Sequence, residues 1–150
     1  MTYHGRSFLA FTALFAAAAI PPADAAVTRT PFQQYVYGNC GVGDCTISFP
    51  TVATNYRIEL NNVSCYVSGN ADVELDYLQL SVIKGTATAV VFTLPMQEEG
   101  GGSSGFSYGA NTYTSVFAAA GYHFKAVARP LSGKLIMLAC NLGGEKVKLS

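Results

Sequence analysis

The chain has 150 residues, and its nine Lys and Arg balance nine Asp and Glu, so its formal net charge at pH 7 is zero. A neutral chain lacks the electrostatic field that draws nucleic acid or anionic lipid to a protein, so neither is expected as a partner. Charged residues form only 12% of the sequence, a share typical of an exported β-protein, and a surface this poor in charge favours packing on a partner.

The first 25 residues resemble a secretory signal peptide. A short segment with His4 and Arg6 precedes an apolar run over residues 8–20, and Ala23 and Ala25 form an A-x-A cleavage pattern. We therefore expect cleavage after residue 25 and a mature protein that is secreted or periplasmic.

Residues 26–150 have the length of one domain. The apolar run over residues 8–20 is well short of the roughly 20 residues that cross a bilayer. No cysteine near the cleavage point offers a lipid attachment site. The sequence predicts a single domain without a membrane span after cleavage.

All four cysteines lie in the predicted mature part, and in an exported chain they are expected to form two disulfides. Cys65 and Cys140 each share a strand face with apolar neighbours, which favours a Cys65–Cys140 bridge across the core and leaves Cys40–Cys45 as the second pair. Cys45 also shares a face with Ile47, so a bridge from Cys45 into the core stays open as an alternative. A C-x4-C spacing matches neither a redox motif nor a zinc motif, so no metal and no cofactor is expected.

Apolar residues in the mature chain recur at every second position, which indicates strands rather than helices. This pattern predicts an all-β fold, a single antiparallel β-sandwich of about eight or nine strands, disulfide-stabilised and jelly-roll-like or another Greek key. A change of phase between Tyr77 and Leu78 predicts either a bulge in one long strand or a bend at which the chain switches sheets. The expected strands cover residues 32–37, 45–49, 56–60, 63–67, 73–82, 87–94, 112–119, 122–129 and 134–142.

A glycine-rich segment over residues 100–105 is predicted to be a mobile loop between strands. Glu98 and Glu99 precede it, and Tyr108 and Tyr113 follow it. The carboxylates are candidate calcium ligands and the tyrosines candidate platforms for a sugar or peptide, so these four residues form the candidate ligand site. The plainer interpretation, which the composition favours, is a solvated hairpin tip.

Candidate catalytic groups are few. His123 is the single histidine of the mature chain and falls on the polar face of an expected strand. Glu74 and Asp76 share a strand face at a spacing that lets two carboxylates work together, but alternation with apolar neighbours favours a plain solvent-exposed face. The sequence therefore predicts a protein that is not an enzyme.

Three hypotheses about function remain. The first is an exported non-catalytic binding module for a glycan or a protein, and the third is an enzyme of unfamiliar kind. The second is a structural subunit of a surface assembly, because a low-charge β-domain behind a signal resembles pilin-type subunits that pair by donated strands. Such subunits lack a strand of their own fold, whereas the expected strand over residues 134–142 predicts a closed domain.

Overall fold

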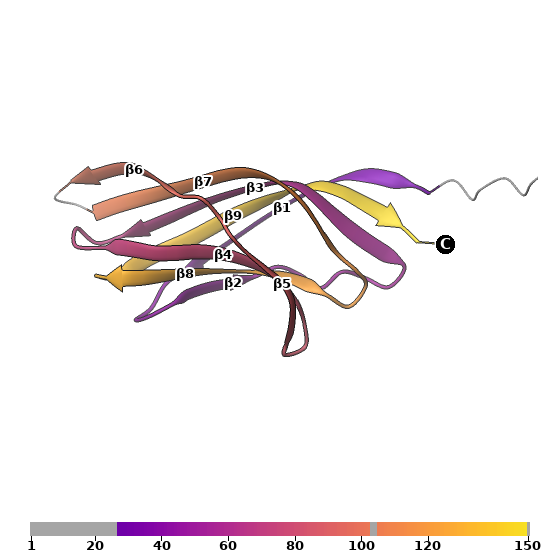
Figure 1. Cartoon of the computed structure of the whole chain (residues 1–150), viewed down its shortest axis with the longest axis horizontal. Coiled ribbons are helices and arrows are strands. Elements are labelled where there is room, and N and C mark those ends of the chain that lie inside the picture. The colour runs from indigo at the N-terminus through magenta and orange to yellow at the C-terminus, as the bar shows by residue number, and fades with distance from the viewer. Residues whose placement is uncertain (1–26, 103–104, 150) are drawn as a thin grey trace, which may run out of the picture.

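The computed structural model describes residues 27–102 and 105–149, and they form an all-β sandwich of two antiparallel sheets (Figure 1). The predicted signal peptide lies outside the described residues. The two-sheet sandwich confirms the fold class predicted from the alternation of apolar residues.

Nine strands form within the described residues, five in one sheet and four in the other. The five-stranded sheet has the order β1 (Arg29–Asn39), β9 (Leu135–Lys148), β3 (Tyr56–Gly69), β7 (Gly105–Ala118), β6 (Gln97–Gly102). The four-stranded sheet has the order β2 (Cys45–Ser48), β8 (His123–Ser132), β4 (Glu74–Lys84), β5 (Ala87–Thr93).

The strands pair as nested antiparallel partners around the β4–β5 hairpin. Outward from that hairpin the pairs are β3 with β7, β2 with β8 and β1 with β9. A long two-stranded ribbon that is wound up in this way is a jelly roll, and β6 adds a short strand beside β7. The winding places strands that are distant in sequence side by side in both sheets.

The core lies between the sheets and is built from alternate residues of each strand, as period-two patterning requires. β8 shows the pattern most clearly, since Phe124, Ala126 and Ala128 are buried while the residues between them are half-exposed. The largest fully buried side chains come from both sheets: Leu78, Leu80, Leu94, Phe124, Leu135, Leu138 and Leu142.

β3 differs from the prediction, whereas β4 agrees with it closely. The sequence predicts a gap between residues 60 and 63, but β3 is continuous there. The buried positions shift from even-numbered to odd-numbered residues at this point, and a bulge between Leu60 and Asn62 accommodates the shift within one strand. The predicted bulge of β4 occurs as a register shift between Leu75 and Tyr77, close to its expected place.

Part of the glycine-rich segment is strand, so the prediction of a loop was wrong for residues 100–102, whereas the interpretation as a hairpin agrees with the pairing of Gly102 and Gly105. Gly100, Gly101 and Gly102 belong to β6 and pair with the first residues of β7. A side chain at Gly101 would collide with the ring of Phe106, so glycine makes room for this aromatic residue on the partner strand. This backbone pairing of residues 100–102 is a feature that composition does not reveal.

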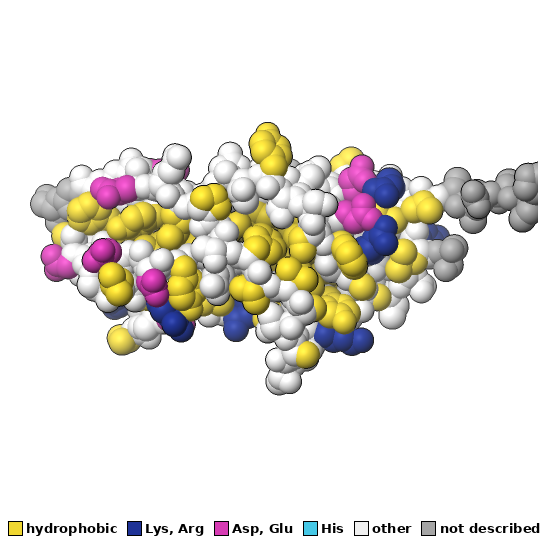
Figure 2. Space-filling model, viewed as in Figure 1, with side chains coloured by type: hydrophobic (Ala, Val, Ile, Leu, Met, Phe, Trp, Pro, Cys, Tyr) yellow, Lys and Arg dark blue, Asp and Glu magenta, His cyan; other side chains and the backbone are white. Residues whose placement is uncertain are grey.

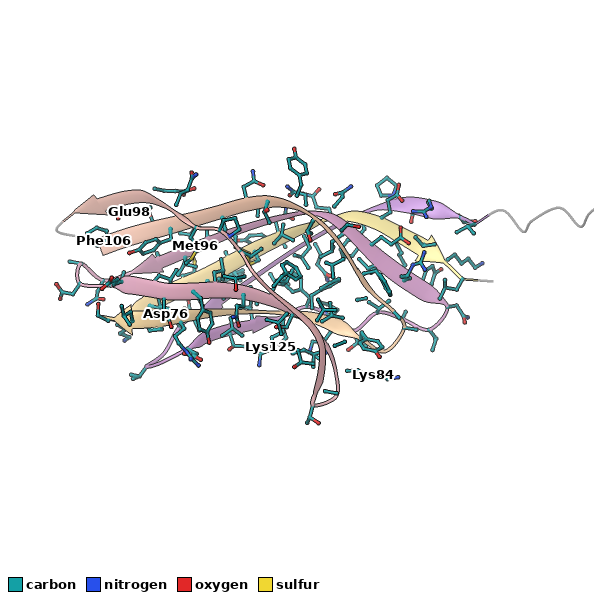
Figure 3. All side chains as sticks on the ribbon, in the orientation of Figure 1. Asp76, Lys84, Met96, Glu98, Phe106 and Lys125 are labelled. Carbon is teal, nitrogen blue, oxygen red and sulfur yellow. A yellow bond between two sulfur atoms is a disulfide. The ribbon has the colours of Figure 1, made fainter. Side chains whose placement is uncertain are left out.

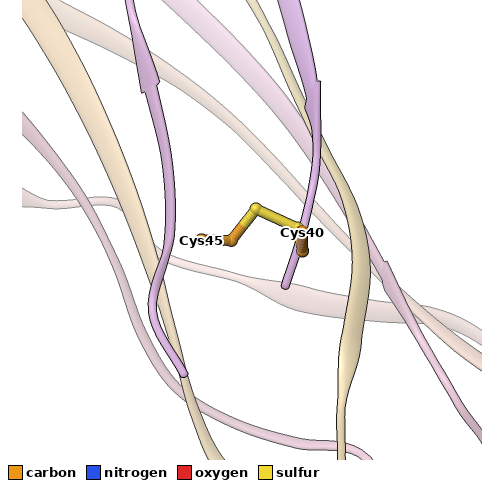
Figure 4. Close-up of a disulfide and its surroundings, with 2 residues drawn as sticks. All are labelled: Cys40 and Cys45. Atoms are coloured by element: carbon orange, nitrogen blue, oxygen red, sulfur yellow. A yellow bond between two sulfur atoms is a disulfide. The ribbon is translucent and has the colours of Figure 1, made fainter. Parts of the chain in front are cut away.

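The structure contains the two disulfides that the sequence favoured, Cys40–Cys45 and Cys65–Cys140. Cys65 lies directly opposite Cys140 on neighbouring strands, so this bridge lies within one sheet rather than across the core as expected. Cys40–Cys45 is the bridge that joins the two sheets, where the chain passes from β1 to β2 (Figure 4). Cys45 is buried, as the alternation of apolar residues in its strand indicated. Its partner is Cys40, which directly follows β1, and not a cysteine of the core strands.

Replacing each disulfide by a pair of alanines is expected to reduce the free energy of unfolding unequally. The Cys65–Cys140 bridge spans 75 residues and the Cys40–Cys45 bridge spans five. Loop-closure entropy therefore predicts losses of about 4 kcal/mol and about 2 kcal/mol, respectively. Urea unfolding followed by circular dichroism measures both, and a larger loss for the Cys40→Ala, Cys45→Ala variant would contradict the ranking.

Candidate functional site

The four residues of the predicted ligand site do not converge. Glu98 and Glu99 are exposed on β6, and the Glu99 side chain lies against Gly109 of β7. Tyr108 points towards the core, where its hydroxyl donates a hydrogen bond to the carbonyl oxygen of Val73 at 3.2 Å. Tyr113 is 89% exposed. It lies five residues after Tyr108 on the same strand, and because side chains alternate between the two faces of a strand, the two tyrosines point to opposite faces.

The candidate catalytic groups do not form one cluster. Figure 3 shows Asp76 on β4, and Glu74 lies two residues before it on the same strand, whereas Ile83, the partner of His123, lies near the other end of β4. Glu74 and Asp76 are exposed, and His123 is half-buried at the start of β8 opposite Ile83. No group of three His, Cys, Asp or Glu side chains that could hold a metal ion occurs within the described residues.

The feature that stands out is a place where two sheet edges are free. β6 pairs with β7 only as far as Gly109, so β7 has a partner on one side alone over residues 111–118. β5 is an edge of the four-stranded sheet, and among the described strands it pairs only with β4. We call β5 together with residues 111–118 of β7 the open corner.

An apolar groove of about 290 Å³ lies between these two edges. Val82 and Val90 line it from the four-stranded sheet, and Val116 and Phe117 line it from β7. Figure 2 shows apolar side chains exposed in the region between the upper sheet and the projecting β4–β5 hairpin. Val90, Val91 and Phe117 are 42%, 51% and 59% exposed. A sheet edge with this much exposed apolar surface can dock another strand.

The strand composition distinguishes these edges from the others. Neither β5 nor residues 111–118 contain a charged residue, a proline or a glycine. The remaining edges carry features that discourage strand pairing: β1 has Arg29 and Pro31, β2 has only four residues, and β6 has three glycines and two glutamates. The two edges of the open corner are therefore the ones least protected against pairing with another strand.

Charged side chains gather elsewhere, in pairs that tie the ends of strands. Arg129 of β8 donates two hydrogen bonds to Asp44 in the β1–β2 turn, at 2.9 and 2.8 Å. Its guanidinium also lies 4.9 Å from the ring centroid of Tyr77. At another strand end, Arg29 bonds Glu59 and Glu145. The Arg129 guanidinium lowers the pKa of the Asp44 carboxyl below its usual value.

Known proteins add little to this description. No protein-family model and no curated protein matches the chain. Among solved structures, it is similar to a chain from Bacillus endospore appendages, described as a novel family of disulfide-linked pili. The two share 6% identity with a TM-score of 0.37, over 89% of this chain and all of the other. A likeness this weak has no bearing on function.

Candidate membrane spans were sought among the described residues, and no helix there is long and apolar enough to cross a bilayer.

The Asp44 carboxyl is expected to titrate below 3.8, its ordinary value, because protonation breaks two hydrogen bonds to a cation. The stability that this pair contributes is present above the unfolded pKa and is lost as pH falls through the lowered folded pKa. NMR titration of the carboxyl carbon measures the value. In Arg129→Gln the pKa of Asp44 should return towards 3.8, and an unchanged pKa would contradict the assigned cause.

Proposed function

We propose that this protein is an exported, non-catalytic interaction module, a subunit of an extracellular assembly whose copies join through β-strand pairing at the open corner. The observation that carries the proposal is the pair of unprotected edges on either side of an apolar groove. The sequence suggested a closed domain because residues 134–142 form a continuous strand. β9 does lie within the five-stranded sheet, but the sandwich is open at another edge.

Strand pairing suits the chemistry of this corner. An incoming strand satisfies the free N–H and C=O groups of an edge, and its alternate side chains enter the neighbouring groove. On β5, Val90 lines the groove while Val91 points to the other face. The pairing therefore gains backbone hydrogen bonds and buries apolar surface at the same time.

The symmetry of pairing decides the form of the assembly. Two β5 edges that pair with each other form a closed dimer, because each copy uses the same surface. A β5 edge that pairs with residues 111–118 of the next copy forms a head-to-tail contact, which can continue into a filament. The uncharged composition of both edges is compatible with each arrangement, since no like charges oppose one another.

Export supports an extracellular place of assembly. The predicted signal peptide and the two disulfides both fit an oxidising compartment. Among the described residues, Glu74 and Asp76 lie at the end of β4 away from His123, and the neighbouring Glu59 and Glu145 are bound by Arg29, which favours a structural or binding role over an enzymatic one.

Wild-type protein is expected to associate with rising concentration, as measured by light scattering after size exclusion and by electron microscopy. Val91→Lys should be monomeric at the same concentrations, because a lysine on an edge strand must lose its hydration when another strand pairs there. Val91 is 51% exposed in the single chain, so this substitution leaves the fold intact.

Val127→Lys is the matched control. Val127 is half-exposed on β8, which has a partner on both sides, so the variant should associate like wild type. A wild-type protein that stays monomeric at its highest soluble concentration would refute the proposal. Equal association of Val91→Lys and Val127→Lys would refute the role of the β5 edge.

A further inference from the structure

A second surface lies away from the open corner, on the outer face of the five-stranded sheet. Here the register of β1, β9, β3 and β7 aligns rows of side chains across four strands. We call these positions the tyrosine platform. Its rows are Tyr37, Ala139, Tyr66 and Gly109; Tyr35, Asn141, Ser64 and Asn111; and Gln33, Gly143, Asn62 and Tyr113.

No position of the platform carries a charge. Arg29, Glu59 and Glu145 form ion pairs at one end of this face, and at the margin beside β6 the Glu99 carboxylate lies against Gly109 of the platform. The Glu99 carboxylate disfavours an anionic ligand, and the platform positions themselves carry no charge that could bind an ion, so a neutral ligand fits this surface.

The tyrosines stand above small neighbours. Tyr35, Tyr37 and Tyr66 are 61%, 65% and 38% exposed, whereas Ala139 between Tyr37 and Tyr66 is 5% exposed. The ring centroids of Tyr35 and Tyr37 are 6.1 Å apart and their planes are inclined by 30°. Two adjacent aromatic rings on a stiff strand offer a stacking surface at low entropic cost.

The polar groups between the rings are largely free to bind. Among the described residues, the platform contains one side-chain hydrogen bond between two of its members, from Nδ2 of Asn62 to Oδ1 of Asn111 at 3.0 Å. The hydroxyls of Tyr35, Tyr37 and Tyr66 form none within the described part of the chain. Their hydrogen-bonding capacity is left to solvent or to a ligand.

A shallow pocket of about 370 Å³ continues the platform at one end. Tyr66 belongs to both, and the pocket is completed by hydroxyls of Ser68 and Ser107, by Phe106, and by the backbone of the glycine-rich strand β6. Its volume falls within the range of small-molecule sites. Tyr66 thus links an open stacking surface to a hollow with both hydroxyl and aromatic walls.

We infer that the tyrosine platform and its pocket bind a neutral polysaccharide. Sugar rings combine apolar C–H faces, which stack on tyrosine, with hydroxyls that bond to amides and hydroxyls, and both kinds of group alternate here. Tyrosine is also common in protein interfaces, so the choice of a sugar rests on the amides and hydroxyls that alternate with the rings and on the lack of large aliphatic side chains among the platform positions. The disulfide between Cys65 and Cys140 joins the two central strands directly beneath this surface, so the platform is preorganised.

The test is retention of the full mature chain on insoluble cellulose and on chitin, with soluble polygalacturonate as the anionic comparison. Wild-type protein should bind at least one neutral polymer, with an affinity that does not fall in high salt because no charges are involved. Tyr37→Ala combined with Tyr66→Ala should weaken binding at least about tenfold, since both stacking rings are lost.

Tyr77→Ala is the matched control, because Tyr77 lies on the four-stranded sheet beside Arg129 and should leave retention unchanged. Circular dichroism and the self-association of each variant verify that the fold and the open corner are intact. Failure of wild type to bind either neutral polymer would overturn the inference, as would unchanged binding by the double variant. Preferential, salt-sensitive binding of polygalacturonate would overturn it as well.

Discussion

The pairing of β3 with β9 is the constraint on which the rest of the structure depends. These two 14-residue strands lie at the centre of the five-stranded sheet, and Cys65 faces Cys140 near the middle of their contact. β1 is added to one side of this pair and β7 to the other. The close approach also restricts side chains, because a Cβ at Gly144 would collide with the carbonyl of Glu59. The pair therefore defines both the core beneath it and the flat surface above it.

Jelly-roll winding explains why the two candidate surfaces differ. Nested pairing leaves two edges next to each other, β5 and residues 111–118 of β7, and no strand of the described residues pairs with their outer sides. The central strands β9 and β3 pair with neighbours on both sides beneath the platform, so their outer face presents side chains. Edges favour recognition of another strand through the backbone, whereas a paired face favours recognition of a ligand through tyrosines and amides.

Much of the fold was predictable from local pattern. Alternation along a strand such as β8 records which side chains are buried, and strand parity with the cysteine positions favoured the observed disulfide pairs. The candidate site was less accessible. Tyr108 and Tyr113 are neighbours in sequence and point to opposite faces, whereas Tyr37 and Tyr66 are distant in sequence and flank the same Ala139. The alternation of Tyr35 and Tyr37 with Val36 was the one available signal for the platform.

The sequence by itself determined the strand content, the inward-facing residues and the low charge, because each of these is a property of composition or of period-two patterning. Tertiary structure alone decided the order of the strands and their register, which depend on contacts between distant segments. It therefore decided that the Cys65–Cys140 bridge lies within a sheet, that glycine-rich β6 pairs as a strand, and which edges are free. The physical reason is that backbone hydrogen bonds form between any two strands, so local sequence does not specify the partner.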